Sequence, residues 1–133
     1  MKIKYEKYSA YPPIENLDRK WPDKIITKAP IWCSVDLRDG NQALIEPMDS
    51  IRKMRMFKHL VKIGFKEIEI GFPSASETDF NFVRELIADN HIPEDVTVQV
   101  LTQSRKPLIQ KTVDSLKDCN LSLIHISEPT RRS

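Results

Sequence analysis

Three stretches of the chain have the apolar pattern of buried β-strands, and each is followed by apolar residues at helical spacing. The strands are predicted to start near residues 31, 66 and 96. The predicted helix faces are Ile51, Met54, Phe57, Leu60 and Val61, then Phe80, Val83 and Ile87, and then Leu108, Ile109, Val113 and Leu116. Strands that alternate with helices are typical of an α/β fold with parallel strands. Periodicity alone does not separate a closed (β/α)₈ barrel from an open sheet, although no GxGxxG follows the first strand, which disfavours dinucleotide binding.

Capping residues predict where two of these helices begin and end. Asp49 or Ser50 is suited to start the first helix, and Gly64 to stop it. Ser76 and Asp79 have the spacing of a capping box, with Asp in place of the usual Glu or Gln.

Residues 1–30 have a different composition, in which aromatic residues alternate with prolines. Because proline fixes φ and lacks an N–H donor, we expect this segment to be an extended arm. Its aromatic side chains predict packing on the domain or on a partner subunit. The aromatic residues are Tyr5, Tyr8, Tyr11 and Trp21.

Composition excludes several classes of protein. The 133 residues are 40% hydrophobic and 30% charged with a net charge of +2, which does not favour a nucleic-acid or membrane partner. The two cysteines form neither a disulfide framework nor a CxxC pair, so reduced thiols and a cytoplasmic location are expected.

Polar residues follow the first predicted strand at Arg38, Asp39, Gly40 and Gln42. In parallel α/β folds the site lies at the carboxyl ends of the strands. Arg38 offers a planar, fixed positive charge for an oxyanion, and Asp39 a hard oxygen ligand for a divalent cation. Gly40 predicts a sharp turn. The alternative is a solvated Arg–Asp pair in an ordinary loop.

Two acids on the second strand share one face, because side chains alternate across a strand. Glu69 lies nearer the carboxyl end and is predicted to reach Arg38, whereas Glu67 is predicted to extend into solvent. Thr102 ends the third strand at the level expected for substrate contact. Residues interpreted as structural or core are His59, His91, Met48, Met54 and Met56.

Together these motifs resemble the 2-isopropylmalate synthases, in the longer of their two bacterial subgroups. The first-strand segment SVDLRDGNQ at residues 34–42 carries most of the likeness, and YSAYPPI at residues 8–14 is similar to that family's N-terminal arm. The segments EIEIGFPSAS at residues 67–76 and VQVLTQSR at residues 98–105 resemble its second and third strand ends.

The resemblance implies a metal-dependent (β/α)₈ TIM barrel, with the first three βα units in residues 31–120. It implies an acyltransferase that condenses acetyl-CoA with 3-methyl-2-oxobutanoate in leucine biosynthesis, using Mg, Mn or Zn, as a homodimer. By resemblance Arg38 and Glu69 are catalytic, Asp39 binds the metal and Gln42 contacts substrate. Thr102 is a further candidate for substrate contact.

Other functions remain open on the sequence. A homocitrate or citramalate synthase would use the same machinery, and a non-catalytic α/β interaction module could use the arm as a docking strand. The family's His-x-His metal motif does not occur in residues 1–120. About three of the eight βα units of a barrel are present, so we expect the 133-residue chain by itself to be inactive and prone to aggregate.

The last residues depart from the pattern. The segment LSLIHISEPTR at residues 121–131 resembles the translation of a transposase adapter used to prepare sequencing libraries. On this interpretation the authentic protein ends near Asn120, and His125 is not a metal ligand. Residues 121–133 are then predicted to be disordered or poorly packed.

Overall fold

The computed structural model describes residue 12 and residues 28–128. The chain divides into two units, Met1–Pro30 and Ile31–Ser133, and the second carries all the elements discussed below. The predictions for the arm's aromatic residues lie outside the described residues.

Unit 2 alternates strands and helices. The strands are β1 (Cys33–Ser34), β2 (Glu67–Gly71), β3 (Thr97–Gln103) and β4 (Ser122–Ser127). The helices are α1 (Ser50–Ile63), α2 (Glu77–Ala88) and α3 (Lys106–Ser115), and a single π-helical turn, η2 (Asp36–Gly40), follows β1.

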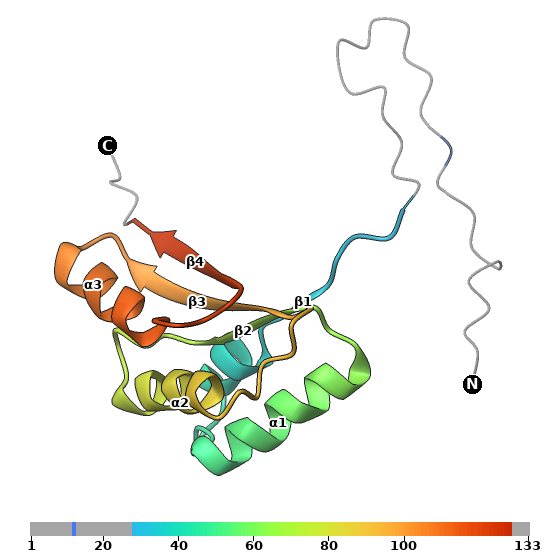
Figure 1. Cartoon of the computed structure of the whole chain (residues 1–133), viewed down its shortest axis with the longest axis horizontal. Helices are drawn as coiled ribbons and strands as arrows, with labels where there is room; N and C mark the ends of the chain where they lie inside the picture. The colour runs from blue at the N-terminus through green and yellow to red at the C-terminus, as the bar shows by residue number, and fades with distance from the viewer. Residues whose placement is uncertain (1–11, 13–27, 129–133) are drawn as a thin grey trace, which may run out of the picture. The chain divides into compact units, whose positions relative to one another are not determined.

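The four strands form one parallel sheet in the order β1-β2-β3-β4 (Figure 1). The predicted α/β fold with parallel strands is therefore confirmed. Helix α1 packs against α2, and α2 packs against α3. A parallel sheet with a helix after each strand is the repeating unit of a TIM barrel, so the predicted partial barrel is confirmed as the architecture.

The hydrophobic core lies between the sheet and the helices. Ile68 and Ile70 of β2 and Val98 of β3 are fully buried against Phe57 of α1 and Phe82 of α2. Burial of each such side chain contributes about 1.5–3 kcal/mol of transfer free energy. The opposite face of β2 carries the acids, as the alternation predicted.

The caps of α1 and α2 agree with the sequence, with one exception. Asp49 accepts a hydrogen bond from the Arg52 N–H at 2.8 Å, and Gly64 ends α1 with a left-handed φ of 110°. Ser76 accepts from the Asp79 N–H at 3.3 Å. The reciprocal half of the predicted capping box does not form, because the Asp79 carboxylate turns inward to Phe72 and Lys53.

Two predicted core positions are wrong. Ile51 is 82% exposed, and the inward position on α1 is taken instead by Lys53, which is 1% exposed. Val113 of α3 is 47% exposed, since α3 turns Thr112 and Ser115 toward the sheet. Both errors arise because a polar residue can occupy an inward position once it has a partner, and here Lys53 pairs with Asp79.

The predicted disorder of the tail is wrong for residues 122–127. Segment 122–127 pairs with β3 along its whole length, from Val98↔Ser122 to Gln103↔Ser127. Its side chains pack poorly, as expected, and only Ile124 is partly buried against the core. Ile124 and Ile126 are β-branched and have strong β propensity, and the edge of β3 offers backbone groups that need partners, which explains the pairing.

Within the described residues, no helix has both the length and the apolar character that a membrane crossing requires.

Candidate functional site

The loop after β1 is wound into a single π-helical turn. The backbone N–H groups of Arg38, Asp39 and Gly40 all point to the carbonyl oxygen of Val35, at 3.2, 2.9 and 3.1 Å. π-Helical turns are uncommon and are frequent at functional sites. The sharp turn predicted at Gly40 is present, but Gly40 does not have a positive φ and a Cβ placed there would make only ordinary contacts, so the turn does not require glycine at this position.

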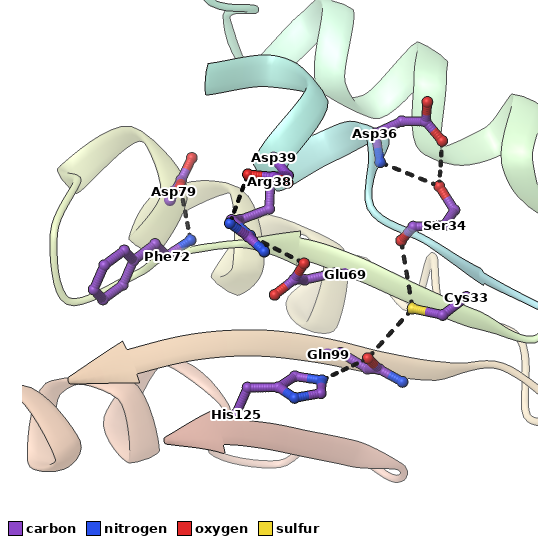
Figure 2. A network of polar contacts seen from close by, with 10 residues as sticks. All are labelled: Cys33, Ser34, Asp36, Arg38, Asp39, Glu69, Phe72, Asp79, Gln99 and His125. Carbon is purple, nitrogen blue, oxygen red and sulfur yellow. Dashed lines mark hydrogen bonds and ion pairs between the residues drawn. The ribbon is translucent and has the colours of Figure 1, made fainter. Parts of the chain in front are cut away.

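This turn directs Arg38 between two carboxylates (Figure 2). Arg38 Nη1 donates to Asp39 Oδ1 at 2.9 Å, and Nε lies 3.0 Å from Glu69 Oε2. The Glu69 side chain is 5% exposed and that of Arg38 is 21% exposed, whereas Asp39 is 63% exposed. The predicted contact between Glu69 and Arg38 is therefore present at the carboxyl end of the sheet.

The geometry of the Arg38–Glu69 pair leaves donors on the guanidinium. The Nε–H does not point at the Glu69 oxygen, so Nε is buried without a hydrogen-bond acceptor despite its short distance to the carboxylate. Within residues 28–128 no hydrogen bond involves Arg38 Nη2. The pair is thus a close charge contact, and the guanidinium retains the capacity to donate to an oxyanion.

The other two predicted site residues are not brought into this cluster. Gln42 lies just beyond η2, and its exposed side chain has no hydrogen bond to another described residue. Thr102 is fully buried, and its hydroxyl lies 3.4 Å from that of Ser74 in the loop after β2. Val98, Val100 and Thr102 alternate on the helix-facing side of β3, so Thr102 lies on the opposite face from Glu69.

A polar network that the sequence did not single out crosses all four strands. Gln99 of β3 donates from Nε2 to Glu67 Oε2 at 2.8 Å. Its Oε1 lies 3.3 Å from Cys33 Sγ and 2.7 Å from His125 Nε2 (Figure 2). The Glu67 carboxylate is therefore held by Gln99, where solvent had been predicted. The alternation on β3 places Gln99 opposite Glu69, which is the signal that could have identified it.

The network and the acids next to it also affect the Cys33 thiol. Burial raises the pKa of Cys33, and the negative charges of Glu67 and Glu69 raise it further. The thiol is therefore neutral at physiological pH.

A second missed residue shapes the loop between η2 and α1. Asn41 is buried, and its Oδ1 accepts from the Met48 N–H at 2.7 Å. This bond closes the loop of residues 41–48 on itself, which fixes the direction in which α1 leaves the site.

Asp39 is the described residue that could hold a metal ion. Asp39 Oδ1 is held by Arg38, and the second carboxylate oxygen, Oδ2, has no hydrogen-bond partner within residues 28–128. A hard, exposed oxygen suits a divalent cation. No three His, Cys, Asp or Glu side chains of the described residues gather as a metal-binding group.

Comparison with known proteins identifies relatives of the chain. The sequence model of the HMGL-like family matches residues 29–132, a range that includes β4. The chain is 62% identical over 120 residues to the 2-isopropylmalate synthase of Azotobacter vinelandii, covering 90% of this chain and 22% of that protein. Identity to the synthase of Paraburkholderia xenovorans is 60% over 124 residues, covering 93% of this chain and 22% of that protein. The protein of the same name from Pseudarthrobacter chlorophenolicus is 62% identical over 117 residues, 88% of this chain and 20% of that protein. The chain thus spans about a fifth of the length of these relatives.

Proposed function

The chain belongs to the HMGL-like family, and on that premise we propose that it is part of a 2-isopropylmalate synthase. The complete protein condenses acetyl-CoA with 3-methyl-2-oxobutanoate and releases 2-isopropylmalate and CoA. It works as a cytoplasmic homodimer with a divalent cation, Mg, Mn or Zn. Support comes from the relatives of that name and from the Arg38 cluster at the carboxyl end of the sheet.

Arg38 is the residue that carries the proposal. Removal of a proton from the acetyl methyl group leaves negative charge on the thioester oxygen, and a fixed cation nearby lowers the energy of that enolate. Glu69 and Asp39 hold the guanidinium from two sides, at 3.0 and 2.9 Å, so its position is set before the substrate arrives. The terminal Nη2, which has no hydrogen bond to the described residues, is the donor proposed to serve the enolate oxygen.

Asp39 and Gln42 serve the second substrate. Asp39 would hold the cation through its free oxygen, together with ligands from outside this segment, and the bound cation supplies Lewis acidity at the ketone. Gln42, which lies exposed beside η2, contacts the oxo acid. The carbanion then forms the new C–C bond at the ketone carbon, and water hydrolyses the thioester to release CoA.

The proposal is tested with a chimera, in which the matched segment of this chain replaces its counterpart in the Azotobacter vinelandii synthase. CoA release is measured with 3-methyl-2-oxobutanoate, 2-oxoglutarate and pyruvate. The expected result is a preference for 3-methyl-2-oxobutanoate that matches the unmodified host enzyme. A chimera that folds and binds acetyl-CoA but releases CoA with none of the three oxo acids would show that this segment does not supply synthase machinery.

A further inference from the structure

A lysine is buried in the core between α1 and α2. The side chain of Lys53 is 1% exposed, and its ammonium pairs with Asp79 Oδ1 and lies 5.4 Å above the centre of the Phe82 ring. A buried cation is tolerated only where it is paired, and Asp79 is the acid that faces it. The pair joins α1 to the first turn of α2 and takes the place of the predicted capping-box bond.

The second oxygen of the same carboxylate holds the end of β2. Asp79 Oδ2 accepts from the Phe72 N–H at 2.8 Å (Figure 2), directly after the last residue of the strand. A Cβ at Gly71 would lie only 2.8 Å from Asp79 Oδ2, so the backbone there approaches the carboxylate as closely as glycine allows. Asp79 therefore fixes the chain where it leaves the sheet.

This point of attachment coincides with an irregularity in the sheet. Glu69 pairs with Gln99, but the next partners along β3 are Gly71 and Val100, so β2 contains one extra residue. Bulges of this kind redirect the side chains around them and are over-represented next to active sites. The displaced residue, Ile70, comes directly after Glu69, whose carboxylate contacts Arg38.

We propose that Asp79 is a positioning residue, which holds the bulge of β2 through the Phe72 N–H and thereby keeps the Glu69 carboxylate against Arg38. Without this anchor β2 regains regular pairing after Glu69, which removes the local bend and twist beside Glu69 and redirects its side chain. The Lys53 ammonium pairs with the Asp79 carboxylate and sets its orientation. The catalytic consequence rests on the proposed function, whereas the structural link between Asp79 and Arg38 does not.

Two double variants in the chimera separate the anchor from the ion pair. Lys53→Met/Asp79→Asn removes both charges but keeps an amide oxygen for the Phe72 N–H. Lys53→Met/Asp79→Ala removes the charges and the acceptor together. Neither variant leaves a buried charge without a partner, so differences between them report on the anchor. Glu77→Gln is the matched control, because Glu77 lies in the same helical turn and its one ion pair within residues 28–128 is with the partly exposed Lys111.

The first measurement divides the effect between turnover and binding. In the double variant Lys53→Met/Asp79→Ala, kcat is expected to fall roughly 10- to 100-fold, with KM for the oxo acid nearly unchanged, since misplaced catalytic groups slow the chemical step. The double variant Lys53→Met/Asp79→Asn and the control Glu77→Gln should keep the parent kcat. Equal kcat values in the two double variants would overturn the proposal.

The second measurement does not depend on activity. Modification of Arg38 by phenylglyoxal, followed by mass spectrometry, reports whether Glu69 still covers the guanidinium. The rate of Arg38 modification should rise only in the double variant Lys53→Met/Asp79→Ala. An unchanged rate would overturn the proposal even if the chimera makes no 2-isopropylmalate. If the double variant Lys53→Met/Asp79→Ala does not fold, Lys53→Met/Asp79→Ser replaces it, because the serine side chain is too short for its hydroxyl to reach the Phe72 N–H.

Discussion

Arg38 Nε lies 3.0 Å from Glu69 Oε2, although the two residues are 31 positions apart and come from different strand ends. The contact places a cation next to a carboxylate that is almost completely buried, at the carboxyl end of a parallel sheet. The proximity of Asp39 on the other side leaves the guanidinium little freedom to rotate. The predictions below follow from this fixed position.

Glu69→Gln should weaken turnover in the chimera by about tenfold or more, because the neutral amide no longer holds Arg38 in place. Glu67→Gln is the matched control, since Glu67 accepts a hydrogen bond from Gln99 that a glutamine can also accept. Steady-state kinetics of both variants checks this prediction. Equal losses in the two variants would show that the contact with Arg38 has no particular role.

Asp39→Asn should abolish metal-dependent turnover while leaving the fold intact, because an amide oxygen is a much weaker ligand for a hard cation than a carboxylate. The measurement is activity against added Mg, Mn or Zn after chelation, with circular dichroism as the test of folding. Asp36→Asn is a suitable control, as that exposed carboxylate accepts from the Ser34 hydroxyl. Unchanged metal dependence in Asp39→Asn would contradict the assignment of Asp39.

The fold and the centre of the site were predictable because each rests on short-range patterns. Alternation placed Glu69 on the face away from the core, and the strand–turn order placed Arg38 at the same end of the sheet. Thr102 shows where the pattern was misapplied, since it lies at the correct end of β3 but faces the helices.

Other features depend on contacts between distant segments. Lys53 occupies an apolar position of α1, and only the three-dimensional structure shows that Asp79, 26 residues later, compensates its charge. The bulge in β2 and the π-helical turn leave no sequence pattern of their own. For this reason only one of the two hydrogen bonds of the predicted capping box is present in the structure.

Cys33 should make stability depend on pH in the alkaline range. Burial raises the pKa of the thiol above its ordinary value of 9.0. A raised pKa in the folded state stabilises the fold below the unfolded pKa, and this stabilisation disappears as the pH rises through the folded pKa. The difference in unfolding free energy between the wild-type chain and Cys33→Ala should therefore shrink above pH 9. A difference that stays constant from neutral to alkaline pH would rule out this linkage.

The tail strand should contribute to stability mainly through Ile124. Ile124→Ser is expected to lower the unfolding free energy of the 133-residue chain by roughly 1–3 kcal/mol, because this side chain packs against the core. Ile126→Ser, at a position that is 57% exposed, should be nearly neutral. Urea unfolding of both variants checks this, and equal effects would mean that β4 does not dock as described.

The adapter origin of residues 121–131 remains a prediction, and resequencing of the source DNA across codon 120 decides it. An adapter junction at that codon would mean that a foreign segment occupies the position of a fourth strand. Continuous genomic sequence through codon 133 would make β4 native, in accord with the family match to residue 132.

The proposed reaction depends most directly on Arg38, and the kinetics of Arg38→Lys in the chimera tests it. Lysine keeps the charge but lacks the planar fork of donors. The expected result is a loss of roughly 10²–10³ in kcat, as for removal of a preorganised donor at an oxyanion, with KM for 3-methyl-2-oxobutanoate nearly unchanged. A variant that loses oxo-acid binding as strongly as turnover would contradict the account, because Arg38 would then bind the substrate carboxylate rather than the enolate.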